Sequence, residues 1–256
     1  VGQAHRRVGL VDVLATGAAG AVGVDAQILL VDLDITDIVE FVARTAYVTG
    51  VGDTPPAIAM RHVPGTSRLC LVLGPNASGK SLLRRLAGAA CKAKGIEYMP
   101  ISMEFRTGQQ FGMGRAFVYG GTEMENSTGE NSSRSVVGGI RTCRAREAPH
   151  VIFWDEPDIG LSDGYARGMG RAIAALAQDT PEHTVAAFVV THRKALVREL
   201  LAADPHVVFM GDESAASLDE WLARDEAPLD IEALPRRSSG TYTRVAAIRR
   251  ALGLRD

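Results

Sequence analysis

The sequence has no uninterrupted apolar run approaching the roughly eighteen residues that a membrane-spanning helix requires. Arg6 and Arg7 are followed by a stretch rich in glycine and alanine, whereas a signal peptide would continue with a leucine-rich core. We therefore expect a soluble, cytoplasmic protein with no insertion into a membrane.

Cysteines are also few, and the net charge is close to zero. The three cysteines, Cys70, Cys91 and Cys143, lie far apart and form no CxxC pair, which favours buried thiols in a reducing compartment and disfavours a zinc site. The 28 Lys and Arg residues nearly balance the 30 Asp and Glu residues, so no overall positive field attracts nucleic acid or anionic lipid. DNA could be bound only locally, by the arginines near the C-terminus, although a solvent-exposed helix face is the more ordinary explanation of such a cluster. These arginines are Arg236, Arg237, Arg244, Arg249, Arg250 and Arg255.

Apolar residues are abundant, at 46% of 256 residues, which is enough to fill the core of one large domain. From residue 69 onward, short apolar runs typical of buried strands alternate with helical patterns. This alternation favours an α/β fold with a mostly parallel sheet covered by helices on both faces. The predicted strands are 69–73, 96–102, 151–154, 185–190 and 206–210. The predicted helices are 81–94, 132–148, 163–178, 194–202 and 242–254.

The two ends of the chain are less clearly patterned. Residues 1–25 are predicted to form a poorly defined arm. Residues 26–34 have the pattern of a strand and residues 35–48 fit either a helix or a strand, so we expect an additional N-terminal β-rich portion. Residues 213–256 are predicted to be a C-terminal helical extension of a domain that spans residues 1–212.

Eight residues between an apolar strand and a helix fit the pattern GxxxxGK[ST] at every fixed position. The glycines allow a turn tight enough for successive N–H groups to face phosphate oxygens, and the following helix adds its positive N-terminal end. Lys80 would reach the β and γ phosphates, and the Ser81 hydroxyl would bind Mg²⁺. The pattern predicts that ATP and Mg²⁺ are bound by Gly74, Pro75, Asn76, Ala77, Ser78, Gly79, Lys80 and Ser81.

Two carboxylates end the apolar run VIFW, where they are costly unless they meet a cation, water or hydrogen-bond donors. Asp155 is expected to hold Mg²⁺ through its water shell, and Glu156 to polarise the water that attacks the γ-phosphate. His192 follows the next apolar run, at a strand end where open α/β sheets collect their ligands, and could contact the γ-phosphate or the attacking water. Each feature alone would be ordinary at a strand end, but the glycine-rich turn upstream favours the catalytic interpretation.

Together these segments resemble the ABC (ATP-binding cassette) ATPase superfamily, a group of P-loop NTPases that includes transporter motors, SMC and Rad50-type heads, and small phage or plasmid ATPases. GPNASGKS resembles the Walker A motif, VIFWDEP the Walker B motif with its catalytic glutamate, and Thr191-His192 the switch histidine. Residues 158–163 resemble the D-loop loosely. The resemblance covers residues 26–212 and implies an ABC-type ATP-binding domain.

The family's signature loop, commonly LSGGQ or LSGGE, has its nearest match in NSTGE at residues 126–130. Ser127, Gly129 and Glu130 are retained, while the leading leucine and the first glycine are replaced. The resemblance implies that this loop binds the γ-phosphate held by an opposing subunit. A helix N-cap with no ligand is the alternative.

The resemblance also implies a glutamine that touches magnesium and the attacking water, and either Gln109 or Gln110 could fill this role. An aromatic residue that stacks on adenine is expected upstream of the glycine-rich turn, where Tyr47 is the candidate.

The interval between Lys80 and Asp155 is too short for the long coiled coil of a Rad50 or SMC protein, so we expect a compact head. The implied function is hydrolysis of Mg-ATP by a head-to-tail, ATP-dependent homodimer that drives or gates a protein partner or DNA, in DNA metabolism or a phage or defence process. The alternatives are a nucleotide-dependent assembly or binding module with little turnover, and the motor subunit of a transporter.

Overall fold

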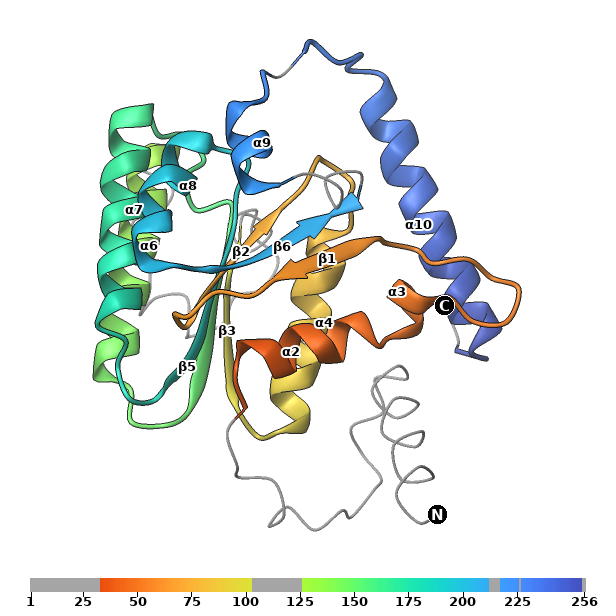
Figure 1. Cartoon of the computed structure of the whole chain (residues 1–256), viewed down its shortest axis with the longest axis horizontal. Coiled ribbons are helices and arrows are strands. Elements are labelled where there is room, and N and C mark those ends of the chain that lie inside the picture. Colours follow the sequence, from red (N-terminus) through yellow and green to blue (C-terminus); the bar gives the residue numbers. More distant parts are fainter. Residues whose placement is uncertain (1–32, 103–125, 212–216, 226, 255–256) are drawn as a thin grey trace.

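Figure 1 shows a six-stranded sheet with helices on both sides in the computed structural model, which describes residues 33–102, 126–211, 217–225 and 227–254. The strand order is β1-β6-β2-β5-β4-β3, with β1 and β6 antiparallel and the other neighbouring strands parallel. The strands are β1 (Met60–Val63), β2 (Leu69–Leu73), β3 (Glu97–Ile101), β4 (His150–Asp155), β5 (Thr184–Val190) and β6 (His206–Met210). The predicted α/β fold with a mostly parallel sheet is confirmed.

The side chains of the central strand β2 point to two layers of helices, one on each face of the sheet. Its five residues are all buried, because successive side chains point to opposite faces and each face is covered. Leu69, Leu71 and Leu73 pack with the helices on one face, and Cys70 and Val72 with those on the other. The helices on the first face are α6 (Thr128–Ala145), α7 (Asp163–Gln178), α8 (Lys194–Leu200) with the short η2 (Leu201–Ala203), and α9 (Leu218–Ala223). On the second face lie α2 (Ile35–Ala43) and α4 (Lys80–Ala93).

The carboxyl ends of three parallel strands meet at one edge of the sheet. In the register of the sheet, Val190 at the end of β5 lies opposite Val72 of β2 on one side and Asp155 of β4 on the other. The turn that follows β2 and the carboxylates that follow β4 are therefore brought to the same edge, where open α/β sheets bind ligands.

The N-terminal portion differs from the expectation of a β-rich region. Residues 26–32 and the arm at 1–25 lie outside the described residues, and residues 33–63 form α2, the short α3 (Ala46–Thr49) and the single strand β1. Helix α2 is set by local signals, because Asp34 and Asp37 form a reciprocal capping box at its start. Its apolar residues then recur at helical spacing and are buried, and they are Ile35, Ile38, Val39 and Val42.

The C-terminal helix α10 (Ala233–Ala251) begins nine residues before the predicted start at residue 242. Pro235 lies in its first turn, where the missing N–H needs no partner within the helix, so this proline is compatible with the earlier start. The helix packs on α3 through Ile248, Tyr47 and Ala57.

The three cysteines are buried free thiols, as predicted. None of the helices within the described ranges is long and apolar enough to cross a membrane.

Candidate functional site

The glycine-rich turn links β2 directly to α4. Gly79 is the N-cap of α4 with φ +98°, and a Cβ atom there would lie 2.3 Å from Ile58 Cγ2, so the position requires glycine both for its backbone and for its space. Ala77 also has a positive φ, +64°, which is costly for a residue with a side chain. The turn therefore holds a strained, tightly packed backbone at the start of a 14-residue helix.

Lys80, the first residue of α4, is folded back across this turn. Its buried Nζ donates hydrogen bonds to the carbonyl oxygens of Gly74 (2.9 Å) and Pro75 (2.8 Å). Burial lowers the pKa of Lys80 to about 8, and the negative charges of Glu156 and Asp155 oppose this shift only in part. The ammonium is thus held inside the turn by neutral oxygens, close to two carboxylates.

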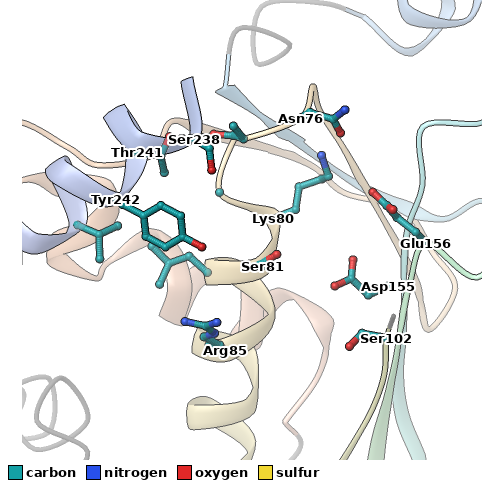
Figure 2. A pocket seen from close by; sticks show the side chains of 14 residues that line it. Asn76, Lys80, Ser81, Arg85, Ser102, Asp155, Glu156, Ser238, Thr241 and Tyr242 are labelled. Carbon is teal, nitrogen blue, oxygen red and sulfur yellow. Dashed lines mark hydrogen bonds between the residues drawn. The ribbon is translucent and has the colours of Figure 1, made fainter. Parts of the chain in front are cut away.

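A pocket of about 360 Å³ opens beside the turn. Figure 2 shows Lys80 and Ser81 in its centre, Asp155 and Glu156 on one side and residues of α10 on the other. The sequence-predicted residues that line this pocket are Asn76, Ala77, Gly79, Lys80, Ser81, Asp155 and Glu156. The structure therefore brings together the two segments on which the nucleotide-binding prediction depends.

Asp155 has a partner that the sequence did not indicate. Nε of Arg84 on α4 lies 3.4 Å from Asp155 Oδ2, with side-chain exposures of 6% and 16%. The same guanidinium donates from Nη1 to Ser102 Oγ, 3.3 Å away and beyond the end of β3. Arg84 thus compensates the charge of a nearly buried carboxylate, which reduces the free-energy cost of a negative charge at the end of β4.

Glu156 faces His192 across the edge of the sheet. His192 Nε2 lies 3.2 Å from Glu156 Oε1, and both side chains are 36% exposed. This histidine is the first cause of the lowered pKa of Glu156, while burial acts in the opposite direction. Glu156 has a left-handed backbone with φ +52°, and its N–H donates to Val190 O at 2.9 Å. Strain of this kind persists where the surrounding structure fixes a side chain in a required direction.

The loop that follows Glu156 is tied to the end of β5. The buried Asp158 accepts hydrogen bonds from Thr191 Oγ1 at 3.1 and 3.2 Å and from Arg193 Nε at 3.1 Å. Arg193 also donates to Asp163 at the start of α7, at 3.0 Å. These bonds connect the D-loop-like segment 158–163 to the residues on both sides of His192.

The signature-like residues do not line the pocket of their own chain. Ser127 is the N-cap of α6, where its side chain accepts a hydrogen bond from the N–H of Glu130. Glu130 forms an ion pair with Arg134 on the same helix at 2.7 Å. Gly129 touches the D-loop-like segment, since a Cβ there would lie 2.6 Å from Gly160 O. Gln109 and Gln110 lie outside the described residues.

The turn has the donors that a phosphate chain requires. Ser78 Oγ is buried and has no hydrogen-bond partner among the described residues. The first N–H groups of α4 have no acceptor within the helix, as at any helix start, and the helix dipole favours negative charge there. These groups, together with the Lys80 ammonium, fit a triphosphate.

Magnesium would have only a few protein ligands in this pocket. No group of three or more His, Cys, Asp or Glu side chains that could hold a metal ion occurs in the part of the chain that is described. Ser81 and Asp155 line the same pocket and could each supply one oxygen. Mg²⁺ commonly takes one or two protein oxygens and completes its shell with phosphate oxygens and water, so two such ligands would suffice.

A search with protein-family models finds no match to the chain, and a comparison with curated proteins finds none either.

Proposed function

We propose that this chain binds Mg-ATP in the pocket beside the glycine-rich turn and hydrolyses it to ADP and phosphate. The observation that carries the proposal is the convergence, at one edge of a parallel sheet, of a buried ammonium, a helix start and two carboxylates. These are Lys80, the first turn of α4, Asp155 and Glu156.

Each residue has a role that its surroundings favour. The Lys80 ammonium would leave the carbonyls of Gly74 and Pro75 to contact the β and γ phosphates. Ser81 and Asp155 would hold Mg²⁺, which neutralises charge on the phosphates when bound. Glu156, which is ionised at neutral pH and lines the pocket, would accept a proton from the attacking water. His192 would orient that carboxylate.

Calorimetry and phosphate release on the wild-type chain test this proposal directly. We expect micromolar or tighter binding of ATP with Mg²⁺, weaker binding when EDTA is present, and release of phosphate that requires Mg²⁺. A chain that shows no heat of binding at submillimolar ATP would contradict the whole assignment. Binding without phosphate release would instead favour the binding-module alternative.

The affinity for Mg-ATP should fall as the pH rises through the pKa of Lys80. In the free protein this pKa is about 8, and bound phosphate would favour the protonated ammonium, so nucleotide binding takes up a proton above that pH. The affinity should be constant below pH 7 and about tenfold weaker at pH 9. Calorimetry in buffers of different ionisation enthalpy would measure both the affinity and the proton uptake. A Lys80→Met control should bind weakly at every pH, and an equally steep pH profile in that variant would show that another group is responsible.

The proposed catalytic unit is a head-to-tail homodimer. The pocket is open, and the signature-like residues Ser127 and Gly129 lie outside it, so a second copy could present them to the bound γ-phosphate. A protein partner moved by this dimer is part of the same proposal. DNA binding has less support, because Arg236 is paired with Asp230 and Arg244 donates to Ala57 O and Thr241 Oγ1.

A further inference from the structure

Helix α10 forms the side of the pocket opposite the carboxylates. Ser238, Thr241, Tyr242 and Val245 line the pocket, and their spacing of three, one and three residues puts them on one face of the helix. Helix α10 packs on α3 (Figure 1), and Figure 2 shows its labelled residues on the side of the glycine-rich turn that faces away from Asp155 and Glu156.

Specific bonds fix the position of α10 relative to the turn. Thr241 Oγ1 donates to the carbonyl oxygen of Ala77, 2.9 Å away. Arg244 Nε donates to Ala57 O at 3.1 Å, one residue before the Ile58 side chain that leaves no room beside Gly79. One turn further along, Ile248 is fully buried in a small cluster with Tyr47 and Ala57. The face of α10 that lines the pocket is therefore held in a defined place.

The direction of a bound nucleotide follows from where the charges lie. Its γ-phosphate must approach Glu156 and Asp155, so the nucleoside must extend to the other side of Lys80 and Ser81. On that side lie Arg85 and the α10 residues Ser238, Thr241 and Tyr242 (Figure 2). The nucleoside would thus meet α10.

Tyr242 is the aromatic residue on that wall. Its side chain is 69% exposed, and Figure 2 shows the ring between α10 and the start of α4. Tyr47, the aromatic residue expected from the family resemblance, is only 8% exposed because Ile248 packs on it, and it does not line the pocket. An aromatic ring that lines the pocket and is largely exposed to water is available to a planar ligand.

We propose that α10 is the nucleoside-binding wall of the site and that the Tyr242 ring stacks on the nucleobase. This inference rests on the proposed function, since it assumes that the triphosphate occupies the glycine-rich turn. Every base has a flat π face, so stacking adds affinity for a nucleotide over a bare triphosphate and does not choose between bases. Tyr242 would therefore distinguish a nucleotide from a bare triphosphate, and not one base from another.

The test compares two ligands, Mg-ATP and Mg-tripolyphosphate, by calorimetry. Tyr242→Ala should weaken ATP binding roughly tenfold and leave tripolyphosphate binding unchanged, because only ATP has a base. Tyr242→Phe, which keeps the ring, should bind ATP like the wild type. Tyr165 on α7 is similarly exposed, at 74%, and does not line the pocket, so Tyr165→Ala is the matched control and should change neither affinity.

The outcomes separate this inference from the proposed function. If the wild type binds ATP but Tyr242→Ala binds it equally well, the stacking role is wrong and the ATP site stands. An equal loss for both ligands would mean that Tyr242 acts on the turn itself, which also overturns the inference. If the wild type binds neither ligand, the proposed function fails and the inference fails with it.

Discussion

Phosphate release by the Glu156→Gln variant should be at least about a hundredfold slower than by the wild type, because a positioned general base contributes at least this factor. The amide has the size of the carboxylate but cannot take a proton from water. The fold should be little affected, since Glu156 is about one third exposed and its contact with His192 lies at the surface of the sheet edge. ATP affinity should be retained, since Glu156 is assigned to the water and not to the phosphates.

Glu199 provides a matched control for this variant. It is also a carboxylate with a cationic partner, Arg171 at 2.9 Å, but it lies on α8 and does not line the pocket. Glu199→Gln should release phosphate at the wild-type rate. Similar rates for wild type and Glu156→Gln would refute the catalytic role of Glu156.

The Glu156→Gln variant also tests whether two copies of the chain pair. If two copies close over two ATP molecules and separate after hydrolysis, blocking hydrolysis should make the dimer persist. Size measurement by light scattering should therefore give a monomer for Glu156→Gln alone and a dimer after addition of Mg-ATP. A variant that binds ATP and stays monomeric would point to a different partner chain in place of the second copy.

The parts of the site that could be predicted from the sequence are the ones encoded within a few neighbouring residues. The turn from β2 to α4 has a fully apolar strand, a spaced glycine pattern and an amphipathic helix in continuous order. The carboxylates after β4 and the histidine after β5 each directly follow an apolar run. Parallel pairing of these strands is enough to place their ends together, and the register of the sheet does so.

The features that could not be predicted depend on packing between distant segments. In the sequence, nothing distinguishes Arg84 from the other basic residues of an amphipathic helix. It lies beside Asp155 only because α4 packs next to β4. The contact of α10 with the turn joins Thr241 to Ala77, 164 residues away in sequence. The burial of Tyr47 could not be predicted either, because no local pattern indicates that Ile248 packs on its ring.

The predicted starts of two helices were wrong for a more local reason. The helix was predicted to start at residue 242, after Pro235, yet proline is compatible with a first helical turn, and α10 includes residues 235–241. The start of α6 was also placed late, although Ser127 is a good N-cap residue with its hydroxyl on the N–H of Glu130. In both cases the signal for a helix start was present and could have been used.

Replacement of Ser127 by aspartate should abolish phosphate release while leaving the chain folded. Aspartate caps a helix as well as serine does and suits the positive helix end, so α6 should keep its start and the melting temperature should stay close to that of the wild type. In the proposed dimer, however, the new carboxylate would face the γ-phosphate held by the other copy and repel it. If Ser127 is only a helix cap, the variant should hydrolyse ATP at the wild-type rate, which would contradict the proposed role in the opposing site.

Mixing two inactive variants distinguishes action in the opposing subunit from action within one chain. Lys80→Ala lacks the ammonium of its own turn but carries an intact Ser127, and Ser127→Asp has the converse defect. A mixed dimer then contains one site built from the two intact halves, so an equal mixture should recover about a quarter of the wild-type rate when subunits pair at random and sites act independently. Each variant alone should remain inactive at the same total concentration. Recovery requires that the two halves of one active site come from different chains, and a mixture as inactive as its components would place both residues in the same chain's site.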